Sequence, residues 1–345
     1  MTSTPAPVDY ALAVRTARRL APAGPQLTLA EAADAVQELR DVTVQAEEHV
    51  RAVTGLVPPV PPGPATVVDR PGWAEGNVDG FRAVLEPLTE RLLDGKRPNA
   101  AATAVTRRVT GVQMGAVLAW LSSRVLGQYE VFLPPEHATG RLTLVAPNIV
   151  ETERRLGVDP SDFRLWVALH EVTHRTQFTA VPWLHDHVRG EVEALLTATR
   201  LDDPVALVSR VREGLAEKRS LVELVQSDEQ RVVLDRVTAL MSLLEGHAEH
   251  VMDGVGPAVV PSVREIRRRF QQRRAHRGSP LDRLLRRVLG MDLKALQYAE
   301  GKAFVDHAVG ALGMAGFNRV WESPAALPTR EEVRAPQRWV DRTAP

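Results

Sequence analysis

The sequence has 345 residues, no cysteine, and 43 basic residues against 43 acidic ones. This length is enough to bury a substantial core, and the lack of cysteine excludes disulfide scaffolds, iron–sulfur clusters, cysteine nucleophiles and cysteine-ligated zinc fingers. A net charge near zero argues against a protein that mainly coats nucleic acid or an anionic membrane.

The N-terminal part predicts helices followed by an irregular segment. Thr28 and Glu31 have the spacing of a capping box, and the amphipathic run that they open extends to about Val53. Five prolines between positions 58 and 64 exclude a helix interior. Residues 56–72 are therefore predicted to form a strap across the surface.

Helical periodicity dominates the rest of the chain, with one short β element. The predicted helices cover residues 73–93, 101–126, 147–156, 160–178, 188–252, an arginine-rich stretch after Pro261, and two more before an irregular tail from Ser323. Two alternating runs, 129–133 and 141–145, predict an antiparallel ribbon. The fold class is thus mainly α, or α+β with a minor β element.

The sequence shows neither a secretory signal nor a membrane-spanning segment. The first residues lack a basic region followed by an uninterrupted apolar stretch, which a secretory signal requires. The most apolar run, 112–126, is interrupted by polar residues and is shorter than the roughly 20 residues of a spanning helix. We expect a cytoplasmic protein without a membrane partner.

The helix after Pro160 carries the sequence His170-Glu171-Val172-Thr173-His174, an HExxH motif. Histidines four positions apart lie on one helix face and can bind a single zinc ion. Glu171 can then act as general base on a water whose pKa zinc lowers to about 7. The alternative is a helix whose two histidines are only hydrogen-bonded to their neighbours.

A catalytic zinc needs a third protein ligand, and two glutamates compete for this role. Glu193 follows His174 after eighteen residues, a gap found in one large aminopeptidase family. Glu245 and Glu249 share one face of an otherwise apolar helix, where carboxylates need a cation or a donor. We favour Glu245 as ligand, with Glu249 accepting the free ring N–H of a ligand histidine. The remaining candidates are His247, His250, His185 and Asp186.

Several segments together resemble a family of zincin-like metallopeptidases. They are LHEVTHRTQF, LLEGHAEHVMDGVGP, GVQMGAVLAWLSSRVLGQYE, SPLDRLLRRVLGMDLKALQYAEGKAFV and FNRVWESPAALPT. The resemblance extends from about Val8 to the C-terminus. It implies a helical zincin-like fold and a gluzincin-type Zn²⁺ site with His170, His174 and Glu245 as ligands and Glu171 as base. One branch of the family is associated with deazaflavin coenzyme biosynthesis.

We accordingly predict a single domain over residues 1–345. Its parts are N-terminal helices (1–55), the strap (56–72), a catalytic core (73–254) and C-terminal helices with an irregular tail (255–345). Three residues are candidates to stabilise the transition state by type: Tyr298, His247 and Arg175.

An arginine-rich segment, residues 262–287, carries a net charge of +8. It is either an anion-recognition face or a solvated helix flank. Aromatic residues are nearly absent from it, which disfavours stacking on single-stranded nucleic acid. No nucleic-acid partner is predicted.

The predicted function is hydrolysis of an amide or peptide bond by metal-activated water, on a peptide or an amide-containing small molecule. Two alternatives remain open. One is a zincin-like scaffold or binding protein without turnover. The other is a metal hydrolase of a phosphorylated or polyglutamylated metabolite, which would give the arginine-rich segment a use.

Overall fold

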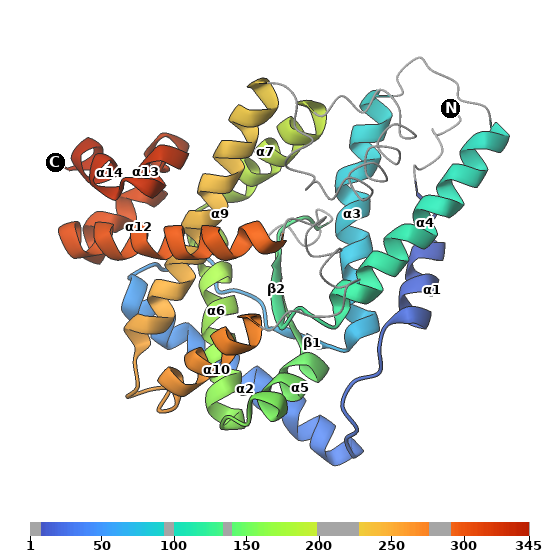
Figure 1. The fold of residues 1–345 in the computed structure, drawn as a ribbon, viewed down its shortest axis with the longest axis horizontal. Coiled ribbons are helices and arrows are strands. Elements are labelled where there is room, and N and C mark those ends of the chain that lie inside the picture. The colour runs from blue at the N-terminus through green and yellow to red at the C-terminus, as the bar shows by residue number, and fades with distance from the viewer. Residues whose placement is uncertain (1–7, 93–99, 134–139, 199–227, 276–290, 345) are drawn as a thin grey trace. The chain divides into compact units, whose positions relative to one another are not determined.

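The computed structural model describes residues 8–92, 100–133, 140–198, 228–275 and 291–344 (Figure 1). For some residues near the ends of these ranges, it describes the backbone but not the side chain. The chain divides into two compact units. The first comprises Met1–Glu48 and Val60–Arg175, and the second His49–Pro59 and Thr176–Pro345. Two helices, α2 (Leu29–Thr54) and α6 (Pro160–Ala180), contribute residues to both units. The fold is mainly α-helical with one small sheet, as predicted.

The first unit combines helices with a three-stranded sheet (Figure 1). Besides parts of α2 and α6, its elements are α1 (Tyr10–Leu20), β1 (Thr66–Val68), α3 (Arg70–Leu92), α4 (Ala100–Ser122), β2 (Gly127–Glu130), β3 (Arg141–Val145) and α5 (Ala146–Leu156). α1 packs on α3 and α4 around the buried side chains of Tyr10, Trp73 and Leu118. The predicted capping box is confirmed, because the backbone N–H of Glu31 donates to Thr28 Oγ1 and that of Thr28 donates to the Glu31 carboxylate.

The sheet has the strand order β1-β3-β2. β2 and β3 pair antiparallel, as predicted, but β2 begins at Gly127, two residues before the predicted run. β1 pairs parallel with β3, with Val67 opposite Leu144. The expectation of a strap without regular structure over 56–72 was therefore wrong at its end. Thr66–Val68 forms a strand because it completes the other side of β3, and α3 begins at Arg70.

The second unit is built from helices (Figure 1). Beyond the end of α6 its elements are α7 (Leu184–Ala198), α9 (Asp228–Val255), α10 (Val263–Ala275), α12 (Met291–Phe317), α13 (Arg330–Arg334), α14 (Pro336–Thr343) and two short 3₁₀ turns, Asn318–Trp321 and Pro324–Ala326. α9 packs against α7 and α12, and the core includes Leu243, Phe304, Phe317 and Trp339.

The expected irregular tail from Ser323 is instead largely helical. Thr329 and Glu332 form a capping box at the start of α13, and Pro336 stands at the start of α14. The Trp339 side chain is fully buried, so tertiary packing stabilises helices that are too short to persist alone. No helix among the described residues is both long enough and apolar enough to cross a bilayer.

Candidate metal centre

Helix α6 carries the HExxH motif in a buried setting. Asp159 caps its first turn by accepting a hydrogen bond from the Asp162 backbone at 3.0 Å, and Pro160 opens the helix. The apolar residues around the motif are all buried, as predicted: Leu165, Trp166, Val167, Leu169 and Val172. The helix is therefore held on several sides, which fixes the directions of its polar side chains.

The two histidines of the motif point to one place. Their Nε2 atoms lie 3.2 Å apart, and the rings are nearly perpendicular, with centroids separated by 4.7 Å. Two imidazoles that bind one tetrahedral zinc at 2.0–2.1 Å have nitrogens about 3.3 Å apart. The spacing of His170 and His174 thus suits a shared cation.

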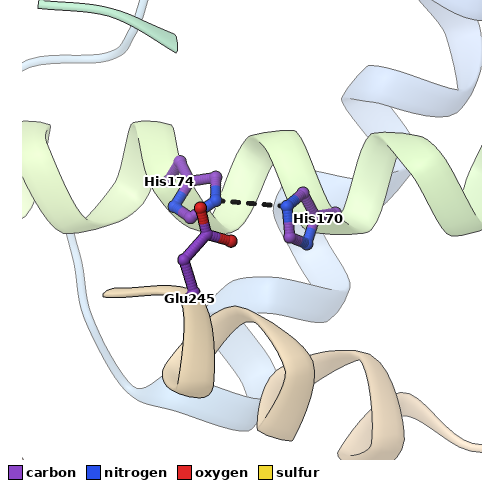
Figure 2. Close-up of side chains that lie close together, drawn as sticks. All are labelled: His170, His174 and Glu245. Atoms are coloured by element: carbon purple, nitrogen blue, oxygen red, sulfur yellow. Dashed lines mark hydrogen bonds between the residues drawn. The ribbon is translucent and has the colours of Figure 1, made fainter. Parts of the chain in front are cut away.

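Glu245 of α9 completes a group of three possible ligands. One ligand atom each from His170, His174 and Glu245 lie within 4.8 Å of one another (Figure 2). Figure 2 shows the carboxylate of Glu245 directed at the two rings. Among the described residues, no group of this kind includes Glu193, His185, Asp186, His247 or His250.

Gln177, which the sequence reasoning did not single out, connects the end of α6 to α9. It is fully buried, and its Nε2 donates to the carbonyl of Leu244 at 2.9 Å and contacts His247 Nδ1 at 3.0 Å. It lies three positions after His174, so both side chains are on the same side of the helix. That spacing was the one sequence signal that could have indicated it.

Glu171, the expected general base, is buried and lies beside strand β2. Its side chain is 6% exposed, and its carboxylate end approaches the backbone of Gly127. Because Glu171 follows His170 by one position, it is turned about 100° around the helix from this histidine. It can therefore stand beside the ligand group rather than belong to it.

Glu249 pairs with an arginine of α10. Its carboxylate pairs with Arg267 of α10 at 3.2 Å, and the same guanidinium lies 2.9 Å from Asp253. Its expected hydrogen bond with a ligand histidine stays a prediction. Within the arginine-rich segment, Arg267 is thus partly neutralised, and residues 276–287 lie outside the described part of the chain.

The structure describes the side chains of two of the three candidates for transition-state stabilisation. Tyr298 lies in helix α12, but its side chain is outside the described residues. His247 is fully buried and stacks on Phe317, with ring centroids 5.5 Å apart. Arg175 is 2% exposed, pairs with Glu47, and donates to the carbonyl of Gly63 at 3.1 Å. The contacts of His247 and Arg175 are typical of residues that stabilise the fold.

Tyr129 of β2 is a half-buried ionisable residue that the sequence reasoning did not consider. Burial raises the pKa of its phenol to about 12, although the nearby positive charge of Arg175 works against this rise. Tyr129 therefore stays protonated throughout the neutral range.

Comparison with known proteins extends beyond the motif. The sequence pattern of a family described as "Zincin-like metallopeptidase" matches residues 8–340. The chain is also similar to a crystal structure from Chloroflexus aurantiacus, that of a proposed hydrolase with a novel fold. The two share 32% sequence identity and a TM-score of 0.70, over 97% of this chain and 98% of the other. No curated protein matches the sequence. The relationship therefore covers nearly the whole chain.

Proposed function

This chain belongs to the zincin-like metallopeptidase family, and from this premise we propose that it is a zinc-dependent hydrolase of amide or peptide bonds. One observation carries the proposal: His170, His174 and Glu245 gather their ligand atoms within 4.8 Å, with Glu171 next to His170 on the same helix. The substrate class is a peptide or an amide-containing small molecule.

The donor set fits zinc. Two imidazole nitrogens and one carboxylate oxygen are ordinary zinc donors, and three protein ligands leave one position of a tetrahedral site for water or substrate. The three side chains are neither fully buried nor fully exposed, so a small molecule can reach them. Hard cations such as Mg²⁺ prefer sets of oxygen donors, which this group is not.

When bound, zinc would polarise the scissile carbonyl and lower the pKa of a water molecule to about 7. The protein's own residues would do the rest. Glu171 would accept a proton from the attacking water and deliver it to the leaving amine. The surrounding apolar residues of α6, including Leu169 and Val172, would keep bulk water from the base.

We also propose a cytoplasmic location and an association with deazaflavin coenzyme biosynthesis. The proposed association is based on the resemblance to a family of which one branch has it. It is tested by assaying the amide-containing intermediates of that coenzyme class beside general peptide substrates.

The first prediction concerns the metal. Purified protein should contain about one zinc per chain, and the variant His174→Ala should contain almost none, because the site then loses one of its two imidazoles. Mass spectrometry of the metal content measures both. A wild-type protein that stays free of zinc after zinc is resupplied would contradict the proposal.

The second prediction concerns the base. Glu171→Gln should keep its zinc, because residue 171 is not in the ligand group, but should lose at least about 100-fold in kcat on any substrate found. Metal content and turnover are measured on the same preparation. Zinc bound in both proteins without turnover in either would instead support the scaffold alternative.

A further inference from the structure

Strand β2 stands at one edge of the sheet and has two different faces. Successive side chains of a strand point to opposite sides, so Gly127 and Tyr129 share one face, and Gln128 and Glu130 share the other. Gln128 accepts a hydrogen bond from the indole of Trp73 in α3 at 3.0 Å. Gly127, on the opposite face, lies against Glu171 of α6.

The contact at Gly127 leaves no room for a side chain. A Cβ atom added there would lie 2.7 Å from Cγ, 2.8 Å from Cδ and 3.0 Å from Oε1 of Glu171. These three are the nearest atoms that it would meet. Glu171 is only 6% exposed, so its carboxylate has little space into which it could withdraw.

The backbone does not explain the glycine. Five glycines of the described chain have positive φ angles, and Gly127 is not among them. It sits in a regular antiparallel ladder opposite Leu144, where any residue could adopt the conformation. Glycine weakens a strand and often marks a close approach of another group. Here, the group that approaches is the side chain of Glu171.

We infer that Gly127 is a positioning residue for Glu171. The space that a side chain at position 127 would fill is taken by the Glu171 side chain, so β2 forms the wall that sets the direction of this carboxylate. The contact between Gly127 and Glu171 follows from the geometry alone. An effect of Gly127 on turnover rests in addition on the proposed function, in which Glu171 is the base.

A double-mutant cycle in metal-free protein tests the position without any substrate. Thermal unfolding is measured for wild type, Gly127→Ala, Glu171→Ala and the double variant, all treated with a chelator. Gly127→Ala should lower Tm by about 2–4 °C when Glu171 is present. In the Glu171→Ala background, where the three clashing atoms are gone, the same change should leave Tm unchanged or raise it.

Two outcomes of the cycle would overturn the inference. One is an equal change of Tm in both backgrounds. The other is a failure to fold of both proteins that carry the Gly127→Ala change, because the added methyl group would then clash with something other than Glu171. If only the single variant fails to fold and the double variant folds, the inference is supported in its strongest form.

Turnover provides a second readout. Gly127→Ala should keep about one zinc per chain and lose about 10- to 100-fold in kcat with little change in KM, because a displaced base impairs the reaction more than binding. Gly190→Ala is the matched control, since a Cβ at this exposed position meets nothing within 4 Å. Wild-type kcat in Gly127→Ala would overturn the consequence for turnover. Absence of zinc and turnover from the wild type would contradict the proposed function but leave the Tm cycle valid.

Discussion

Glu245 is held in place by its neighbours in the chain. The carbonyl of Leu244 accepts a hydrogen bond from Gln177, and His247 contacts the same amide. His247 is also fully buried, with its ring 5.4 Å from that of Trp321. The residues on both sides of Glu245 are therefore fixed by contacts that require no metal. A ligand that is positioned in advance loses little conformational entropy when a cation binds.

This arrangement predicts opposite outcomes for the two glutamates that compete as third ligand. Glu245→Ala should weaken zinc binding by at least about 100-fold, because it removes a donor from the group. Glu193→Ala, a partly exposed position on α7 outside that group, should bind zinc as the wild type does. Competition against a chromogenic chelator measures both affinities. Zinc loss in Glu193→Ala alone would reverse the assignment.

At the residue scale, the sequence was informative where the chemistry is local. The spacing of His170 and His174 belongs to one helix, and Glu245 stood out as a carboxylate on an apolar helix face. Gln177 and Gly127 did not stand out, because their roles depend on partners about 70 and 44 positions away in the chain. The contacts of Arg175 could not be predicted from the sequence either, since Glu47 and Gly63 lie far upstream.

Helices α9 and α12 cross at the residue that follows Glu245. A Cβ at Gly246 would stand 2.2 Å from the carbonyl carbon of Gly301, and a Cβ at Gly301 would stand 1.9 Å from the carbonyl oxygen of Ser242. The two backbones are thus in direct contact, which only glycine permits at these positions. This contact explains why glycine follows the candidate ligand in the sequence.

Gly246→Ala should therefore destabilise the protein strongly. The added methyl group meets backbone atoms that cannot move aside, so we expect a loss of at least about 3 kcal/mol in the free energy of unfolding. Gly190→Ala is the matched control, because this exposed helical position has nothing within 4 Å. It should gain up to about 1 kcal/mol. Urea unfolding distinguishes the two, and equal stability of the variants would contradict the close crossing.

The capping box of α13 predicts a dependence on pH. Burial by itself raises the pKa of Glu332, but hydrogen bonds from Arg342 and from Thr329 outweigh it, and the pKa is lowered. A carboxyl with a lowered folded pKa stabilises the fold above its unfolded value, near 4.5, and loses this effect as pH falls through the folded pKa. Glu332→Gln should cost about 1 kcal/mol at pH 7, and this cost should decrease as pH falls below 4.5. Urea unfolding of both proteins at pH 7 and at pH 3 checks it, and an equal cost at both pH values would contradict it.

The elements that sequence reasoning missed are short or non-local. β1 has three residues and pairs with a strand 77 positions later, so no local pattern marks it. α13 has five residues and α14 eight, too few for periodicity to be read. The long helices were predicted well, because their apolar repeats and the cap at Thr28 lie within the segment itself.

For the molecule as a whole, the candidate ligands connect distant parts of the chain. Glu245 lies more than seventy positions after His174. An unfolded chain does not hold such residues together, so a metal that needs all three binds the folded state. Binding to the folded state alone raises its stability by mass action.

Removal of the metal should accordingly lower the stability of wild-type protein. At a free zinc concentration 100 times the dissociation constant, the ion contributes about 2.7 kcal/mol. Thermal unfolding should therefore shift to lower temperature after chelation and recover after zinc is added back. His174→Ala should respond to neither treatment. A wild-type Tm that is insensitive to both would show that the three residues do not share an ion.

The contacts of Arg175 limit which substitutions the chain can accept during evolution. Arg175 occupies a position of the motif helix that looks free to change, yet its guanidinium binds Glu47 and the carbonyl of Gly63 from within the interior. A lysine there has one point of charge and no planar fork, so it cannot reproduce both contacts. In a saturation library, position 175 would tolerate as few substitutions as its apolar neighbours. Drift in the proline-rich segment around Gly63 would likewise be limited by an arginine more than a hundred residues downstream.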